Sequence, residues 1–197
     1  MQRMLITYMV KPRLSAENQH PHTRSAPARW AWALHEQHRR GSLTSQTSGT
    51  ATTSRRTFRM EVAVGITVQA SPATIWALLT NAQDVPRWTS TVQSIQGTIA
   101  LGETIHLKAT IAPERTFKLR VTMWAPNDRM VWQDGSPLFR GVRQYALAPR
   151  RDGATDVTMT EVFSGALLPL IVRSLPDQGP SFERFVADLK AEAERGS

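Results

Sequence analysis

Hydrophobic and polar positions alternate with a period of two along most of residues 58–163. In the first such stretch, residues 58–69, Phe58, Met60 and Val62 begin an apolar series that polar and small residues interrupt. This alternation predicts a strand with one packed face and one solvent-exposed face. Further strands are predicted at 92–98, 103–111, 116–124, 130–133, 139–147 and 155–163. Short turns separate them, so about seven strands are expected, with successive strands pairing antiparallel.

Spacings of three and four residues predict helices before and after the later strands. Ser71 followed by Pro72 is typical of a helix start, and Ile75, Leu78 and Leu79 then share one face. Further helical segments are predicted at 84–88, 165–175 and 182–195. This order predicts an α+β fold in which a curved antiparallel sheet surrounds a C-terminal helix, with two short helices after the first strand.

Several short motifs occur in a fixed order along this region. They are Ala70-Ser71-Pro72, Ile75-Trp76, Leu79-Thr80-Asn81, Val85-Pro86-Arg87-Trp88, Leu138-Phe139-Arg140-Gly141, Gly153-Ala154-Thr155 and Glu161-Val162-Phe163-Ser164-Gly165. Through them, residues 60–195 resemble the START/Bet v1-like (SRPBCC) superfamily, in its polyketide cyclase/dehydrase and lipid-transport group. The resemblance implies a helix-grip fold with a cavity for a hydrophobic small molecule. It implies no single activity, because members range from lipid carriers to cyclases and chaperone activators.

Two residues depart from the pattern of that group. Asn81 stands where members often have Asp, and Arg143 stands where many have His in the strand after a glycine. A mechanism that uses a histidine base therefore cannot be transferred to this chain.

The strand alternation also predicts which side chains line a cavity. On the strand at 139–147, Arg143 and Tyr145 share a face with Phe139, while Trp124 shares the parity of Lys118 and is expected on the outer face. The residues expected to contact a ligand are Trp76, Trp88, Leu107, Phe117, Leu119, Val121, Met123, Trp132, Phe139, Arg143, Tyr145, Met159, Glu161, Phe163, Phe182 and Phe185.

Arg143 and Glu161 are the charged side chains expected on the inner face, and two interpretations of them remain open. In the first, the two form a buried pair that orients a ligand carbonyl or hydroxyl, since apolar pockets gain orientation from a few polar groups. In the second, they form an ordinary salt bridge at the rim, and a β-bulge would reverse the facing of either one. No catalytic residue is assigned.

The composition removes several kinds of chemistry. The chain has no cysteine, which excludes disulfides and thiol nucleophiles, and His106 is the only histidine within residues 58–197. We therefore expect no metal site, no cofactor and no Ser-His-Asp catalysis. The favoured interpretation is a binding protein for a lipid-, polyketide- or isoprenoid-like molecule. One alternative is a cyclase or dehydratase that uses Arg143, Tyr145 or Glu161. The other is a partner-binding module with a membrane-docking basic tail.

Charge separates the chain into two regions. Residues 1–57 carry nine Lys and Arg and two Glu, whereas residues 58–197 carry fifteen Lys and Arg and fourteen Asp and Glu. The high isoelectric point of about 10.9 thus comes from the first region, and we do not expect the second to bind nucleic acid. We expect residues 1–57 to be a disordered basic extension and residues 58–197 to be the ligand-binding domain.

The basic extension allows several interpretations. It fits an organellar transit peptide, a docking arm for an anionic membrane, or sequence upstream of a true start at Met60. No apolar run approaches the length of about 20 residues that a membrane-spanning helix needs. A cytoplasmic protein is expected.

Overall fold

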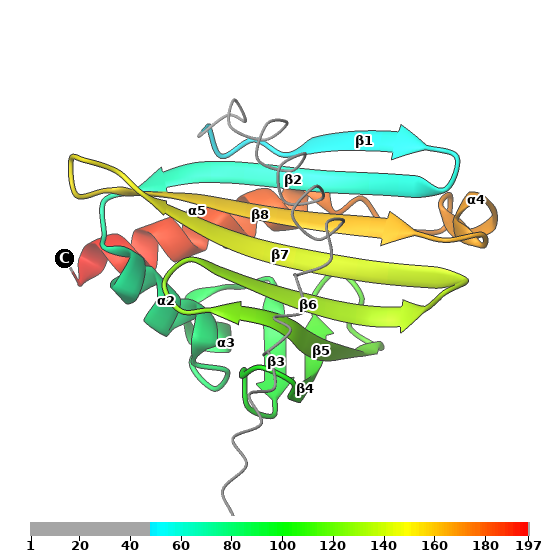
Figure 1. The fold of residues 1–197 in the computed structure, drawn as a ribbon, viewed down its shortest axis with the longest axis horizontal. Coiled ribbons are helices and arrows are strands. Elements are labelled where there is room, and N and C mark those ends of the chain that lie inside the picture. The colour runs from blue at the N-terminus through cyan, green and yellow to red at the C-terminus, as the bar shows by residue number, and fades with distance from the viewer. Residues whose placement is uncertain (1–47, 197) are drawn as a thin grey trace, which may run out of the picture. The chain divides into compact units, whose positions relative to one another are not determined.

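The computed structural model describes residues 48–196, and in these a curved antiparallel sheet packs against a long helix (Figure 1). The strands are β1 (Thr52–Arg56), β2 (Arg59–Val68), β3 (Val92–Gln96), β4 (Thr104–Ala109), β5 (Thr116–Ala125), β6 (Arg129–Ser136), β7 (Phe139–Pro149) and β8 (Thr155–Ser164). The helices are α2 (Pro72–Thr80), α3 (Val85–Trp88), α4 (Leu168–Ile171) and α5 (Gly179–Arg195). Within residues 48–196, no helix is long and apolar enough to cross a bilayer.

Successive strands from β3 to β8 pair as antiparallel neighbours, and the sheet is completed by one long-range pairing. The order is β1-β2-β8-β7-β6-β5-β4-β3, so β2 lies beside β8, the last strand within residues 48–196. These features confirm the predicted fold: a curved antiparallel sheet, two short helices after the strand at residues 59–68, and a C-terminal helix.

The sheet has eight strands, because β1 lies inside the segment that we expected to be an extension. Its five residues are all exposed and show no apolar alternation, so the hydrophobic pattern gave no signal for it. It is held by pairing with β2, through a turn at Thr57 and Phe58. Phe58 is accordingly 59% exposed rather than packed. Residues 1–47 of the expected extension lie outside the described part of the chain.

The start of α2 follows its sequence signals. The side chain of Ser71 accepts a hydrogen bond from the N–H of Thr74 (3.1 Å), and proline occupies the first turn. Ile75, Trp76 and Leu79 are buried by this helix. The cap and the apolar face together fix α2 against the open side of the sheet.

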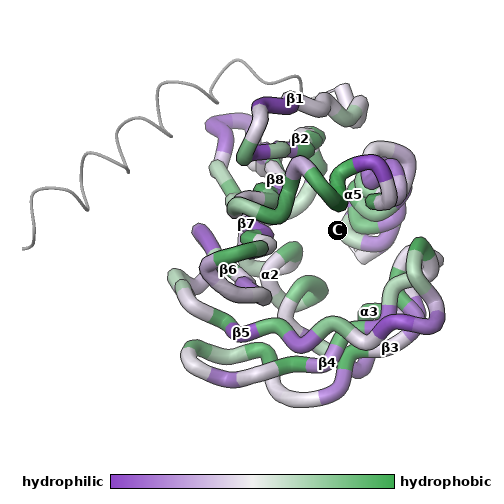
Figure 2. The backbone as a smooth tube through the Cα atoms, turned by 90° about the vertical axis from the view of Figure 1, so that its right-hand side faces the viewer, coloured by the Kyte–Doolittle hydropathy of each residue, from purple (hydrophilic) through white to green (hydrophobic). Residues whose placement is uncertain are grey.

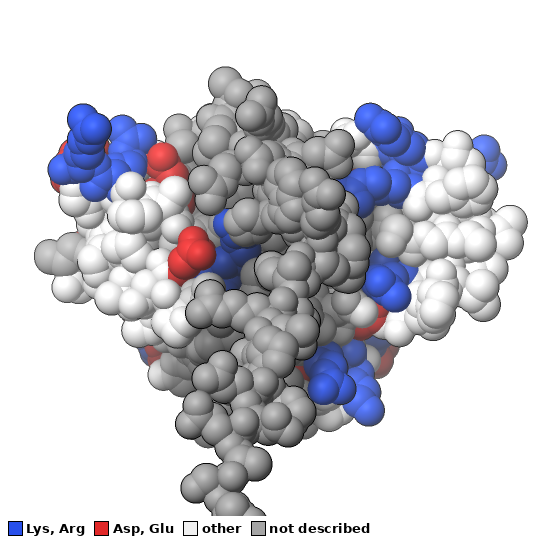
Figure 3. Space-filling model, in the orientation of Figure 1, with Lys and Arg blue, Asp and Glu red and all other residues white. Residues whose placement is uncertain are grey.

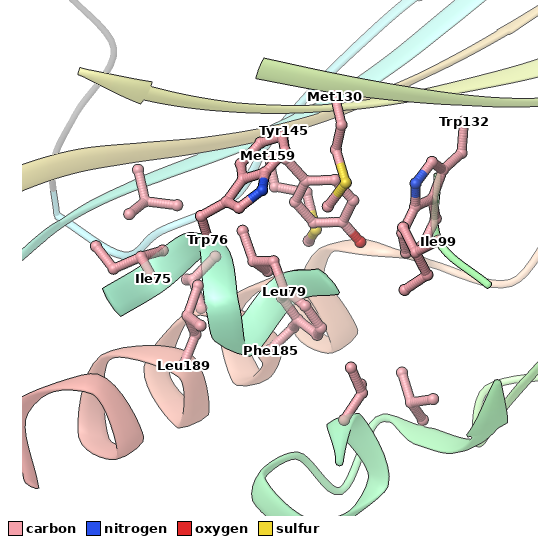
Figure 4. Packing of buried hydrophobic residues seen from close by; sticks show 14 of the residues in the cluster. Ile75, Trp76, Leu79, Ile99, Met130, Trp132, Tyr145, Met159, Phe185 and Leu189 are labelled. Carbon is pink, nitrogen blue, oxygen red and sulfur yellow. The ribbon is translucent and has the colours of Figure 1, made fainter. Parts of the chain in front are cut away.

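Helix α5 covers the concave side of the sheet (Figure 2). It buries Phe182, Phe185, Val186 and Leu189 and makes its most extensive contact with β2. The residues of α2, α5 and the inner sheet face form one hydrophobic core, part of which is drawn in Figure 4. What remains open for a ligand is therefore limited to the part of the concave face that α2 and α5 leave uncovered.

Candidate ligand-binding site

The main cavity lies on the concave face of the sheet, beside the segment that joins α4 to α5. Its volume is about 90 Å³, whereas one water molecule needs roughly 10–15 Å³. The cavity thus has room for a ring or a short chain. Its walls are Leu107, Ala109, Ile111, Ala112, Arg115, Phe117, Leu119, Trp132, Asp134, Phe139, Gly141, Arg143, Glu161, Phe163, Leu175, Pro176 and Gln178.

Two smaller cavities adjoin the main one, and all three share Leu107 and Arg143. Their volumes are about 10 and 20 Å³. Tyr145 lies in the wall of the first and Met159 in the wall of the second. The guanidinium of Arg143 is thus the polar group around which the three spaces are arranged.

Arg143 and Glu161 form an ion pair in the wall of the main cavity. The two residues lie opposite each other on β7 and β8, and Nε of Arg143 donates to Oε2 of Glu161 over 3.1 Å. Their side chains are 19% and 13% exposed. The guanidinium carbon also lies 5.1 Å from the centroid of the Phe182 ring. A charged donor group is therefore held at a fixed place on an otherwise mostly apolar surface.

The protonation states of Arg143 and Tyr145 follow from their surroundings. Burial is the largest single influence on the pKa of Arg143 and lowers it, but the charge of Glu161, the influence of Tyr145 and the hydrogen bonds to both together outweigh burial, so the net shift is upward. Burial also raises the pKa of the Tyr145 hydroxyl, against the opposing charge of Arg143. At neutral pH the first is a cation and the second a neutral phenol. Neither can act as a general base there.

Asp134 brings a second carboxyl group to the cavity, beside Gly141. The N–H of Gly141 donates to Oδ1 of Asp134 (3.1 Å), and a Cβ on that glycine would stand 2.5 Å from the same oxygen. Burial raises the pKa of Asp134, and the charge of Glu161 raises it further. The hydrogen bond and the charges of Arg115 and Arg143 oppose that shift.

Trp132 offers a hydrogen-bond donor that the protein itself does not use. Its side chain is 3% exposed, and its Nε1 is buried without a partner. The ring lines the main cavity and one of the smaller ones, and it packs edge-on against Tyr145 at 5.2 Å (Figure 4). An unpaired buried donor costs about 1–3 kcal/mol. A ligand atom that accepts this hydrogen bond would remove that cost.

Comparison with known proteins assigns the family. The model of the protein family described as polyketide cyclase / dehydrase and lipid transport matches residues 59–194. The chain belongs to this family. The comparison with curated proteins returned no match.

Solved structures support the same assignment for the fold. A protein of Rhodobacter sphaeroides shares 18% identity, with 75% of this chain and 99% of that chain covered and a TM-score of 0.56. A protein of Mesorhizobium loti shares 20% identity, with coverages of 70% and 98% and a TM-score of 0.55. A START superfamily protein of Mycobacterium smegmatis shares 15% identity, with coverages of 70% and 99% and a TM-score of 0.53. This polyketide cyclase/dehydrase and lipid-transport family member therefore has the START/Bet v1-like fold that its sequence predicts.

The structure places the predicted ligand-contacting residues in three groups. The wall of the main cavity contains Leu107, Phe117, Leu119, Trp132, Phe139, Arg143, Glu161 and Phe163. Only the smaller cavities are lined by Tyr145, Met159, Phe182 and Phe185. None of the three cavities is lined by Trp76, Trp88, Val121 or Met123. Contact between any of these residues and a ligand stays a prediction.

Core packing accounts for three of the four residues in the last group. Val121 is fully buried, and Trp76 and Trp88 are 8% and 7% exposed. Trp88 packs edge-on against Phe185 at 5.2 Å. These side chains fill the space between the sheet and the helices, so they support the cavity without lining it.

Met123 was placed on the wrong face, and so was Trp124. The β5–β6 register shifts between Val121 and Met123, so an irregularity of the bulge type interrupts the alternation. Met123 is 42% exposed as a result, and Trp124 turns inward to meet Trp76 at 4.9 Å. The alternation rule holds up to residue 121 of this strand and is reversed beyond it.

The sequence analysis also missed residues of the main cavity. Asp134 shares the alternation of Trp132, so parity alone could have found it. Parity does place Gly141 on the face of Arg143, but a glycine has no side chain to suggest a ligand contact. The turn at 112–115 and the segment at 176–178 have no periodic pattern, and only the folded chain brings them to the cavity.

Proposed function

We propose that this domain binds a hydrophobic small molecule in the main cavity, with a hydrogen-bond acceptor of the ligand directed at Arg143 and Trp132. The observation that carries the proposal is the combination of apolar walls with two buried donor groups, one of them without a protein partner. A lipid-, polyketide- or isoprenoid-like molecule with a carbonyl or hydroxyl group fits this combination.

A carrier or sensor role is favoured over catalysis by the states of the polar groups. Arg143 stays charged and Tyr145 stays protonated, and Glu161 is engaged by Arg143. Within residues 48–196, no cluster of three metal-ligating side chains occurs. The cavity supplies orientation and exclusion of water, which a binding protein needs.

The alternative function is that of a cyclase or dehydratase, and one observation favours it. Asp134 lies in the cavity wall with a raised pKa, so it is better suited to exchanging a proton than an ordinary carboxylate is. In that case Arg143 would stabilise an enolate oxygen. The third interpretation is that a basic tail at residues 1–57 docks on a membrane. Residues 1–47 of this tail lie outside the described part of the chain.

A cavity-filling substitution tests the proposal. Ala109→Phe adds a phenyl ring to the cavity wall, whereas Met123→Phe changes an exposed residue on the other face. Binding of a one-ring apolar probe such as p-xylene, followed as a rise in melting temperature, should be lost in the first variant and kept in the second, with both folded by circular dichroism. Equal probe binding by the wild type and the Ala109→Phe variant would show that the cavity is not the site.

Native mass spectrometry of freshly purified protein then addresses the ligand and the alternative. A co-purified hydrophobic molecule should be present in the wild type and absent from Ala109→Phe. If the molecule bound to Asp134→Asn differs in mass from the molecule bound to the wild type, the protein converts its ligand. That result would support the enzyme interpretation. Loss of water changes the mass whereas ring closure alone does not, so the two molecules are also compared by chromatography. Identical masses and identical retention times favour a carrier.

A further inference from the structure

Four large apolar side chains are exposed together at one end of the domain. Phe58 and Leu138 occupy the two-residue turns between β1 and β2 and between β6 and β7, and they are 59% and 56% exposed. Leu167 and Leu170, at α4, are 39% and 77% exposed. We call these four residues the apolar tip.

Backbone hydrogen bonds bring the parts of the apolar tip together. The N–H of Gly165 donates to the carbonyl of Phe58 (3.2 Å), and the N–H of Leu167 donates to the carbonyl of Leu138 (3.0 Å). Figure 1 shows both turns and α4 at the same end of the sheet. The exposed apolar groups therefore form one surface and are not scattered.

A row of arginines crosses the sheet next to this surface. Arg56 lies opposite Arg59, Arg59 lies opposite Ser164, and Ser164 lies opposite Arg140. Residues directly opposite on neighbouring strands share a face, so Arg56, Arg59 and Arg140 point to the same side of the sheet. We call these three residues the arginine row.

The charge of the arginine row is only partly neutralised. Arg59 pairs with Glu61 at 2.7 Å, while Arg56 and Arg140 form no ion pair with another residue in the described range. Like charges that face each other across strands repel, so an external anion would relieve the row. Figure 3 shows this end of the domain as a mostly uncharged lobe with Lys and Arg side chains beside it.

We propose that the apolar tip and the arginine row dock the domain on an anionic phospholipid membrane. Exposed aromatic and leucine side chains enter the headgroup region, and arginines at the rim bind lipid phosphates. The chain's own first 47 residues are a poor occupant of this surface, because they carry seven Lys and Arg and two Glu. An acidic membrane matches both the charge and the apolar character.

The docking surface adjoins the cavity. Phe139 and Phe163 line the cavity, and their rings stack with centroids 6.0 Å apart. Phe139 directly follows Leu138 of the apolar tip, and Phe163 directly precedes Ser164, which lies opposite Arg59 and Arg140. Leu175 and Pro176, shortly after α4, lie in the same wall. Docking would thus place the cavity wall against lipid, where a hydrophobic ligand could enter or leave. This last step rests on the proposed ligand binding, whereas docking itself does not.

Vesicle flotation with the full-length chain tests the proposal. Phosphatidylcholine vesicles with and without phosphatidylglycerol serve as the membrane. The wild type should bind the anionic vesicles at low salt and dissociate from them as the salt concentration rises. One basic residue near such a surface contributes about fivefold in affinity, so Arg56→Glu with Arg140→Glu should weaken binding by more than roughly 25-fold. Phe58→Ser with Leu170→Ser should weaken it by about tenfold or more.

Two matched variants serve as controls. Arg151→Glu reverses an exposed charge in the turn between β7 and β8, and Leu101→Ser removes a side chain that is 61% exposed between β3 and β4. Both should bind vesicles like the wild type. Every variant changes the domain surface only, so unchanged melting temperatures are expected.

Two results would overturn the docking surface. One is failure of the wild type to bind phosphatidylglycerol vesicles at low salt. The other is equal binding by the tip, row and control variants, which would assign any membrane association to another part of the chain. Probe binding by the same variants, measured without vesicles, reports on the cavity separately, so the two proposals can fail independently.

Discussion

The ion pair between Arg143 and Glu161 should behave very differently when one partner is removed and when both are. Arg143→Met leaves the carboxylate of Glu161 in the cavity wall without its cation, and Glu161→Leu leaves the guanidinium without its anion. The double variant replaces both with apolar side chains of similar volume, in a cavity whose remaining walls are mostly apolar.

The expected magnitudes follow from the burial of the pair. Removing one member of a fully buried pair costs about 3–5 kcal/mol, whereas replacing both is often neutral or stabilising. Because the two side chains are 19% and 13% exposed, water solvates the remaining charge in part. We expect about 2–3 kcal/mol for each single variant, or roughly 4–12 °C in Tm. The double variant should lie within about 1 kcal/mol of the wild type.

Urea unfolding of the four proteins, followed by tryptophan fluorescence, measures this cycle. If Arg143 donates to a ligand as proposed, the double variant should nonetheless lose that ligand. If the two single costs simply add in the double variant, the residues are not coupled and the buried-pair argument fails. If all four proteins have equal stability, the pair is solvated and positions nothing.

Five further variants test three other parts of the structure. Gly165→Ala should cost more than about 3 kcal/mol in urea unfolding, because its φ is +130° and a Cβ would overlap a backbone carbonyl. Gly153→Ala, at φ +84° with nothing within 4 Å, should cost only about 1 kcal/mol. Trp124→Ala should cost about 2–3 kcal/mol and Met123→Ala less than about 0.5 kcal/mol; the reverse order would contradict the bulge. Asp134 has a raised pKa in the folded state, so its contribution to the free energy of unfolding falls as pH rises above about 3.9. Asp134→Asn should therefore gain stability over the wild type from acidic to neutral pH, and a pH-independent difference would refute this.

The sequence predicted the parts of the fold that periodic patterns encode. The strands at 59–68, 139–149 and 155–164 have alternating apolar residues along a half-buried face, and Ser71-Pro72 marks the start of α2. β1 escaped prediction because both of its faces are exposed, so it has no hydrophobic pattern. Its place depends on backbone pairing with β2, which composition does not record.

The cavity was predicted less completely than the fold. Parity placed Arg143, Glu161 and Trp132 in its wall, because β6, β7 and β8 are regular there. A one-residue irregularity in β5 was enough to misplace Met123. Which inward side chains line open space and which are sealed by α2 and α5 depends on three-dimensional packing, and strand parity cannot distinguish them.

The pairing of β2 with β8 has a consequence for the order of folding. Val68 lies opposite Thr155, so β2 lacks a neighbour on one side until the final hairpin has left the ribosome. Joining segments so far apart in sequence requires closing a long loop, which is slower than zipping successive hairpins. The apolar face of β2 also awaits α5, its cover, which follows β8 in the chain. Assembly of the domain is thus completed when its two ends meet, after the strands between them have had time to pair.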